Sequence, residues 1–308
     1  MKAAYFMKNG GPEVMEYGDV PDPVAGPGQV LVDVHAASVN GADWKVRSGS
    51  YAPTTNFPYI PGRDFSGVVS ALGAGVTDFK VGDEVFGVSE QGSEQCYAER
   101  LAMKAAILAK KPKNLSHTEA AAVGLIGLTA LVSIEDTIKL KAGETILIQG
   151  GAGGVASFGV QLAKHIGARV ITTASAANHD YLRMLGADQI IDYNTQDFAK
   201  VVSGLDAVFD TVGGAEVVDR SFAVLRPGGR AAFIASGQTA PVAPRNDVVS
   251  LRPEVRRDRA HLERIAELVT SGAVHVPEIE VYPLSEAAAA HKVSESRHLR
   301  GKLVFKVR

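Results

Sequence analysis

The amino-acid sequence predicts an α/β protein in which a β-rich domain precedes a doubly wound domain with a parallel sheet. Short apolar runs bounded by glycine or proline fill the first third of the chain. After residue 115, strand-like and helix-like segments alternate at the spacing of parallel βαβ units. The length of 308 residues also suits two domains, since an average domain has roughly 150 residues.

The composition excludes several other classes of protein. Hydrophobic residues make up 46% and charged residues 21%, which excludes a disordered chain. The formal charge of −2 gives no general attraction for nucleic acid. Lys8 interrupts the N-terminal apolar run too early for a signal peptide, and no uninterrupted apolar stretch reaches the roughly 18 residues of a membrane span. We therefore expect a cytoplasmic protein without nucleic-acid or membrane partners.

The β-rich part is predicted from short apolar runs separated by turn residues. Strands are expected over residues 30–36, 65–70 and 84–88, and the Pro/Gly-rich run 21–28 cannot be helical. The glycines between these runs suit the turns of a partly closed barrel. Residues 301–307 also read as a strand, which we expect to return to this domain.

The alternating part begins with a predicted helix. Ser116 is a suitable N-cap, and Glu119 completes a capping box before an alanine-rich run. The remaining elements follow from apolar runs and helical periodicity. Strands are expected over 145–149, 169–173, 189–191, 207–210 and 230–235, with helices over 154–166 and 178–185.

A glycine-rich loop follows the first of these strands. Gly151, Gly153 and Ala156 fit the G-x-G-x-x-G/A fingerprint, and a helix continues directly from them. Such a loop lets backbone approach a pyrophosphate, and the helix N-terminus offers free N–H groups to the phosphates. A glycine turn without a ligand is the alternative, but the order of strand, loop and helix favours a dinucleotide.

The nucleotide is suggested by the residues after the second strand. NAD-binding versions carry a carboxylate about 20 residues after the loop, whereas here none occurs before Asp180. Ser175 and Asn178 can hydrogen-bond a 2′-phosphate, and Arg183 or His179 can supply positive charge. The sequence therefore favours NADPH over NADH.

Several ordered motifs match a known superfamily over nearly the whole chain. They occupy residues 38–47, 61–69, 128–130, 153–155, 185–188, 210–214 and 300–302. With them the chain resembles the medium-chain dehydrogenase/reductase superfamily, in its zinc-free quinone oxidoreductase branch. The resemblance implies a GroES-like catalytic domain over 1–118, completed by 273–308, and a Rossmann NADPH-binding domain over 119–272.

The resemblance also bears on metal binding. Zinc-dependent relatives have cysteine where Asn40 stands, histidine where Arg63 stands and cysteine near Leu125. They also have a structural-zinc lobe with four cysteines, and Cys96 is the only cysteine of this chain. The resemblance therefore implies an enzyme without a metal. We expect Cys96 to be a small buried hydrophobe rather than a reactive thiol.

Site residues are carried over from the matched motifs. The resemblance implies that Asn40, Lys45 and Tyr51 lie near the nicotinamide, and Lys45 stands where alkenal-reducing relatives have a lysine. Asn40 equally suits a loop tie, and Lys45 a solvated surface charge. The positions that match cofactor contacts are Thr129, Gly153, Gly154, Val155, Ser175, Asn178 and Tyr193. Many NADPH-using relatives have a lysine shortly after the position of Ser175, where alanines stand here, so the 2′-phosphate partners stay open.

The implied activity is zinc-independent hydride transfer from NADPH to a quinone. Reduction of an enone or alkenal double bond is the nearest alternative, and an NADPH-binding protein that acts through a partner is an alternative of another class. We also expect a homodimer through the Rossmann domains, in which strand 230–235 is the sheet edge that pairs across the two-fold axis.

Overall fold

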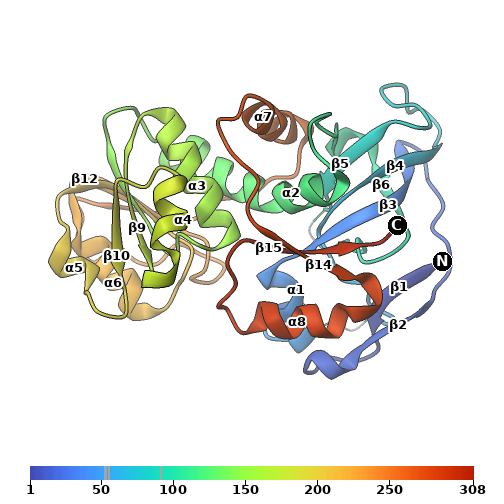
Figure 1. The fold of residues 1–308 in the computed structure, drawn as a ribbon, viewed down its shortest axis with the longest axis horizontal. Coiled ribbons are helices and arrows are strands. Elements are labelled where there is room, and N and C mark those ends of the chain that lie inside the picture. The colour runs from blue at the N-terminus through green and yellow to red at the C-terminus, as the bar shows by residue number, and fades with distance from the viewer. Residues whose placement is uncertain (52–53, 55, 91) are drawn as a thin grey trace. The chain divides into compact units, whose positions relative to one another are not determined.

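The computed structural model describes residues 1–51, 54, 56–90 and 92–308 and shows two compact units (Figure 1). The first unit consists of Met1–Leu125, Arg257–Thr270 and Val276–Arg308. The second consists of Ile126–Arg256 and Ser271–His275. These boundaries differ from the predicted domain limits in three places. The first division falls within a helix, residues 257–270 group with the first unit, and residues 273–275 group with the second.

The first unit is built on a seven-stranded sheet with the order β14-β15-β3-β4-β5-β7, in which β6 also pairs with β3. Its strands are β3 (Gln29–Val39), β4 (Asp64–Leu72), β5 (Glu84–Val88), β6 (Arg100–Lys104), β7 (Leu108–Lys110), β14 (Ile279–Pro283) and β15 (Lys302–Lys306). A separate antiparallel hairpin consists of β1 (Lys2–Phe6) and β2 (Met15–Asp19).

Strand β3 shows why the sequence pattern predicts this sheet. Val30, Val32 and Val34 are fully buried, while the residues between them are partly exposed, as expected for period-2 alternation. The C-terminal strand β15 pairs antiparallel with β3, so the predicted return of the chain end to this domain is confirmed.

The helices of the first unit are α1 (Gly41–Ser48), α7 (Arg259–Thr270), α8 (Ala287–Glu295) and the start of α2 (His117–Leu131), with short 3₁₀ turns η1 (Pro12–Val14), η2 (Ala105–Ile107) and η5 (Leu284–Glu286). Helix α1 begins with a capping box between Asn40 and Asp43. It ends at Gly49, whose φ of 78° is the left-handed conformation that favours glycine.

The second unit is a six-stranded, wholly parallel sheet with the order β10-β9-β8-β11-β12-β13. Its strands are β8 (Thr145–Ile148), β9 (Arg169–Ala174), β10 (Gln189–Asp192), β11 (Leu205–Asp210), β12 (Leu225–Phe233) and β13 (Val249–Leu251). The chain starts at the central strand β8, moves outward on one side and then fills the other. This is the strand order of a Rossmann fold, as predicted.

One prediction about this sheet is wrong. Strand 230–235 was expected at the sheet edge, but β12 pairs on its outer side with β13, in parallel. Strand β13 is not recognisable from the sequence pattern, because it has only three residues. The homodimer itself stays a prediction.

Helices cover both faces of the parallel sheet. They are α3 (Gly154–Ile166), α4 (His179–Met184), α5 (Phe198–Val201) and α6 (Ala215–Ala223), with a 3₁₀ turn η4 (Ala176–Asn178). Figure 1 shows α3 and α4 on one side of the strands and α5 and α6 on the other.

Helix α2 continues into a π-helical segment, η3 (Val132–Ile138). The predicted capping box at its start is confirmed, because the Ser116 amide donates to Glu119 and the Glu119 amide donates to Ser116 Oγ. Within the described residues, His117–Ile138 is the one helix long and apolar enough to cross a membrane, with 22 residues and mean hydropathy 1.6. Of its most apolar stretch, 78% is buried inside the protein, as expected for a core helix.

Candidate functional site

The glycine loop connects β8 to α3 in the second unit. Gly150 has a φ of 73°, and the Gly151 amide donates to Thr173 O at 3.0 Å, so the loop lies against strand β9. A Cβ on Gly151 would lie 2.2 Å from Thr172 Oγ1, so any larger residue there would force the loop or Thr172 to move. Helix α3 begins after Gly153 with no side-chain cap from the described residues, so its first N–H groups are suited to an anion.

Several predicted cofactor residues lie after neighbouring strands of this sheet. The loop from Gly151 to Val155 follows β8, Ser175 and Asn178 follow β9, and Tyr193 follows β10. Because these strands are parallel, their carboxyl ends meet at one edge of the sheet, where ligands bind in such folds. Asn178 Nδ2 donates to Ser175 Oγ at 3.2 Å, so these two side chains are in contact.

Two other predicted cofactor residues have partners of their own. Arg183 forms an ion pair with Asp180 one helical turn earlier, and both side chains are largely exposed. A 2′-phosphate at Arg183 would therefore compete with a carboxylate. Thr129 lies in α2 and is buried, and its carbonyl accepts a hydrogen bond from Ser133 Oγ at 2.6 Å.

The predicted catalytic residues lie on and around helix α1 of the first unit. Lys45 is half-buried, and burial lowers its pKa, with Arg297 contributing and Tyr51 opposing the shift. Tyr51 follows the C-terminus of the helix, and its amide donates to Lys45 O at 3.1 Å. Tyr51 is 39% exposed, and the guanidinium carbon of Arg63 lies 5.4 Å from the centroid of its ring, which is a cation–π contact.

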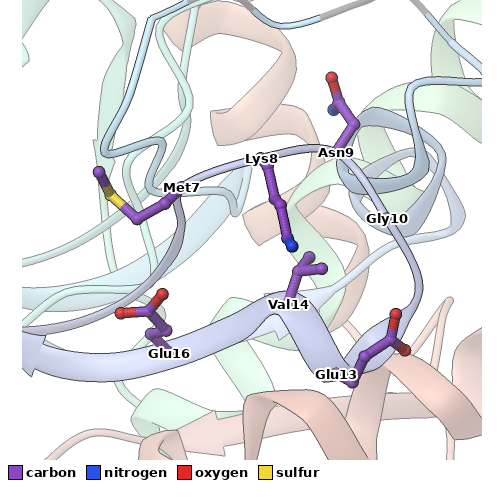
Figure 2. Close-up of a pocket in the computed structure, with 7 residues that line it drawn as sticks. All are labelled: Met7, Lys8, Asn9, Gly10, Glu13, Val14 and Glu16. Atoms are coloured by element: carbon purple, nitrogen blue, oxygen red, sulfur yellow. The ribbon is translucent and has the colours of Figure 1, made fainter.

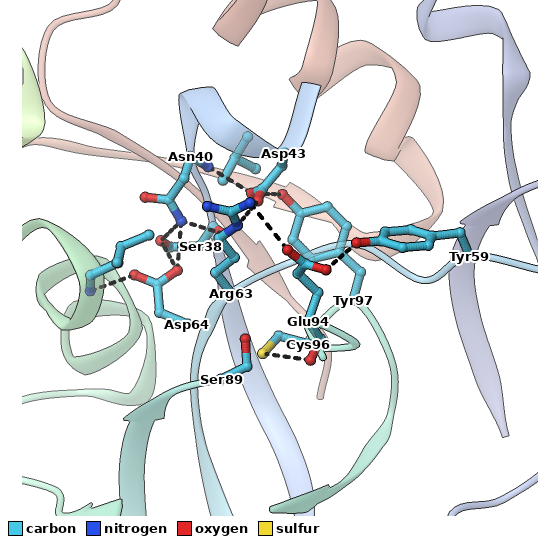
Figure 3. Close-up of polar contacts among 12 residues, drawn as sticks. Ser38, Asn40, Asp43, Tyr59, Arg63, Asp64, Ser89, Glu94, Cys96 and Tyr97 are labelled. Carbon is cyan, nitrogen blue, oxygen red and sulfur yellow. Dashed lines mark hydrogen bonds and ion pairs between the residues drawn. The ribbon is translucent and has the colours of Figure 1, made fainter. Parts of the chain in front are cut away.

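Arg63 belongs to a buried ion-pair cluster, drawn in Figure 3. Its guanidinium lies 3.1 Å from Glu94 and 3.7 Å from Asp43. Tyr97 donates to Asp43 at 2.8 Å, and Tyr59 donates to Glu94. Burial raises the pKa of Asp43 to about 6, and Arg63 counteracts that shift.

A second buried cluster contains Asn40 (Figure 3). Asn40 Nδ2 donates to Asp64 Oδ1 at 2.8 Å, and Asn40 Oδ1 accepts a hydrogen bond from Lys302 Nζ at 2.8 Å. Asp64 also accepts hydrogen bonds from Ser38 Oγ at 2.6 Å and from the Leu125 amide at 2.9 Å. The side chain of Asn40 is therefore bonded inside the protein.

Sequence reasoning missed Asp43, Asp64 and Lys302 as members of these clusters. The available signal was the position of Lys302 at the start of the apolar strand Leu303-Val304-Phe305. A lysine buried in a sheet needs oxygen acceptors, and its partners lie more than two hundred residues earlier in the chain.

Comparison with known proteins agrees with this architecture. The family described as "Alcohol dehydrogenase GroES-like domain" matches residues 26–142, and "Zinc-binding dehydrogenase" matches residues 185–305. An "NADPH-dependent alkenal/one oxidoreductase" of Arabidopsis thaliana is 34% identical over 99% of this chain and 79% of its own length. The chain belongs to the medium-chain dehydrogenase/reductase superfamily.

Solved structures place this superfamily member in the quinone oxidoreductase branch. The quinone oxidoreductase from Coxiella burnetii has a TM-score of 0.92 and 36% identity, over 100% of this chain and 99% of that one. The Escherichia coli quinone oxidoreductase complexed with NADPH has a TM-score of 0.91 and 27% identity, with full coverage of both chains. Cytoplasmic location stays a prediction.

One of the two matching families is described as zinc-binding, but the residues at positions 40, 63 and 125 do not suit a zinc ion. Asn40 is engaged by Lys302 and Asp64, Arg63 is a cation, and Leu125 offers only backbone. Zinc in dehydrogenases needs thiolate, imidazole or carboxylate ligands, so the residues present do not fit it. In the part of the chain that the structure describes, no group of three or more His, Cys, Asp or Glu is placed to hold a metal ion.

Two further features lie apart from these residues. Cys96 is fully buried, as predicted, and burial raises its pKa well above the usual value. A pocket of about 450 Å³ lies beside the N-terminal hairpin (Figure 2). It is lined by Met7, Lys8, Asn9, Gly10, Glu13, Val14 and Glu16, none of which is a predicted site residue.

Proposed function

We propose that this protein is an NADPH-dependent reductase that transfers a hydride to quinones. The observation that carries the proposal is the set of side chains at Asn40, Arg63 and Leu125. They offer no ligands for a metal ion that could polarise an acceptor. The acceptor must then be electron-poor by itself, as quinones and α,β-unsaturated carbonyls are. Relatives with quinone oxidoreductase activity in their names match the full length of the chain.

The second unit supplies the residues that hold NADPH. Its glycine loop and the start of α3 fit a pyrophosphate, and Ser175 and Asn178 follow the strand that approaches the adenosine ribose in such folds. When bound, the nicotinamide of NADPH supplies the hydride. The protein orients the cofactor and keeps its phosphates paired with backbone N–H groups.

We expect NADPH to bind at least tenfold more tightly than NADH, because a 2′-phosphate gains charge-assisted hydrogen bonds and meets no carboxylate before Asp180. Arg183→Ala should weaken NADPH binding roughly three- to tenfold and leave NADH binding unchanged. Asp180→Asn should strengthen NADPH binding, since it frees Arg183 from its ion pair. Fluorescence titration of the free enzyme measures these constants. Equal losses for both dinucleotides in Arg183→Ala would contradict this assignment.

On the acceptor side, we assign proton and hydrogen-bond donation to Tyr51 and Lys45. Lys45 is half-buried and Tyr51 is 39% exposed, and the two lie close enough to interact electrostatically. Reduction of a quinone or an enone develops negative charge on an oxygen atom, and such donors stabilise that charge as it forms. Asn40, whose amide is bonded internally, holds the loop that begins α1.

Tyr51→Phe and Lys45→Ala should slow enal reduction by about a hundredfold, which corresponds to about 3 kcal/mol. Quinone reduction should fall by no more than about tenfold, because a quinone is already electrophilic and needs less stabilisation of the developing oxyanion. Steady-state kinetics with one enal and one naphthoquinone measure both rates. Tyr17→Phe and Lys113→Ala, at exposed positions, are the matched controls. Full rates in both site variants would show that other donors serve the acceptor.

Reduction of enone or alkenal double bonds is the second candidate function. The half-buried Lys45 favours it, since alkenal-reducing relatives have a lysine at the matching position, and so does the match to an alkenal/one oxidoreductase over 99% of this chain. NADPH oxidation measured with a panel of naphthoquinones and enals tests the proposal. Higher kcat/KM for the quinones supports it, and higher values for the enals favour the second candidate. Tight NADPH binding without turnover of any acceptor would favour a binding protein that acts through a partner.

A further inference from the structure

The amide of Asn40 lies between a buried lysine and a buried carboxylate. Its oxygen accepts from Lys302 Nζ at 2.8 Å, and its nitrogen donates to Asp64 Oδ1 at 2.8 Å. Asn40 is 8% exposed, Lys302 4% and Asp64 0%. Water therefore contributes little to the solvation of the two ionisable groups, and each depends on hydrogen bonds within the protein.

The partners of the two ionisable groups indicate their charge states. Lys302 Nζ donates to two oxygens, Asn40 Oδ1 and Val39 O, the latter at 2.6 Å. Asp64 accepts hydrogen bonds from three donors, including the Leu125 amide and Ser38 Oγ. Oxygen acceptors surround the amine of Lys302, as expected for an ammonium. Hydrogen-bond donors surround the carboxyl group of Asp64, as expected for a carboxylate. Attraction between Lys302 and Asp64 opposes the effect of burial on the pKa of each group.

Only one orientation of the Asn40 amide is compatible with these neighbours. In the observed orientation, the negative end of the amide dipole faces the ammonium and the positive end faces the carboxylate. A flipped amide would place its NH₂ group against the ammonium of Lys302 and its oxygen against Asp64. Both hydrogen bonds would be lost in a buried site, where unpaired polar groups are costly.

We propose that Lys302 is a positioning residue that fixes the amide of Asn40 and, through it, the start of helix α1. The helix carries Lys45 and is followed by Tyr51, so this inference rests on the proposed function for its effect on catalysis. This positioning role explains why a lysine stands at the first position of β15, directly before three apolar, buried residues. The internal cation is provided by the last strand of the chain and acts on a loop that precedes α1.

A double-mutant cycle tests this inference. We expect Lys302→Met and Asn40→Ala each to lower kcat for the enal by about tenfold, with the NADPH dissociation constant unchanged. Because Lys302 acts through Asn40, the double variant should also lose about tenfold, rather than the hundredfold of independent effects. Lys306→Met makes the same substitution at an exposed position of β15 and should leave kcat unchanged.

A second variant separates the effect of Lys302 on the orientation of Asn40 from its effect as the counter-charge of Asp64. Lys302→Met leaves Asp64 buried without its counter-charge and is expected to lower the thermal midpoint. Lys302→Met combined with Asp64→Asn removes both charges and should recover most of the thermal midpoint, while kcat stays about tenfold low because no ammonium holds the oxygen of the Asn40 amide. Recovery of kcat together with the thermal midpoint would overturn the inference, as would multiplicative losses in the cycle.

Failure of this inference can be distinguished from failure of the proposed function. If the unchanged protein reduces neither quinones nor enals, the proposed function fails. The cycle can then be measured as free energies of unfolding, in which Lys302 and Asn40 should still be non-additive. If the losses of stability in the two single variants are additive, Lys302 and Asn40 do not act through each other, and the inference is overturned.

Discussion

Gly153→Val is expected to reduce NADPH affinity by at least a hundredfold, about 2.7 kcal/mol, while the fold stays intact. Gly153 has a φ of −72°, which valine adopts readily, and an added Cβ would meet only Gly150 O, at 3.3 Å. The free energy of unfolding should therefore change by only about 1 kcal/mol. The valine side chain would occupy the space through which a pyrophosphate approaches the start of α3, so NADH affinity should fall equally.

Gly151→Ala provides the contrasting variant. Its Cβ would overlap Thr172 Oγ1, whose hydroxyl donates to Ile148 O at 2.6 Å. This variant should lose both dinucleotide affinity and roughly 1–3 kcal/mol of stability, because the loop must move away from β9. Fluorescence titration and urea unfolding of the two variants separate the effects. Wild-type NADPH affinity in Gly153→Val would show that the loop does not contact the pyrophosphate.

Acid should destabilise this protein through His291 on helix α8. His291 is fully buried, and Arg47 donates to its Nδ1 at 3.2 Å, so the folded protein holds it neutral. Burial, with a contribution from Arg47, lowers its pKa from 6.5 to about 3. Between these values the unfolded chain binds more protons than the folded one, so stability decreases as the pH falls below about 6.5. At pH 5 this one group should cost about 2 kcal/mol.

The comparison of wild type with His291→Gln isolates that contribution. Glutamine retains an acceptor for Arg47 and does not titrate. The free energy of unfolding of the variant should therefore fall less steeply between pH 6.5 and 4. Comparison between variants is needed because Asp43, whose pKa is raised to about 6, shifts stability in the opposite direction. Urea unfolding at several pH values measures both slopes. Parallel slopes would show that His291 has the same pKa in the folded and the unfolded protein.

Much of the second unit can be predicted from local patterns. The apolar run of β8, the glycines after it and the helical periodicity of α3 are neighbours in sequence, and their physics is local. The short strand β13 is different, because three residues carry too little periodicity to be recognised. Its pairing with β12 depends on backbone hydrogen bonds that form only once the parallel sheet exists.

The predicted role of Asn40 shows where sequence reasoning ends. An asparagine before a helix suits both a loop tie and a ligand contact, and nothing near it in the sequence separates the two. Its partners lie at residues 64 and 302, on two other strands. A pattern of hydrophobicity cannot predict that these strands bring a lysine and an aspartate to the two ends of one amide.

The sequence by itself determined the two-domain α/β class, the dinucleotide loop and the absence of the cysteines that dehydrogenase zinc sites use. These features depend on residue types and spacings within single segments. The tertiary structure alone decided which charges are buried and how they are paired, as in Lys302 with Asn40 and Arg63 with Glu94. Burial of a charge is favourable only when distant segments supply its hydrogen-bond partners, and folding is what brings those segments together.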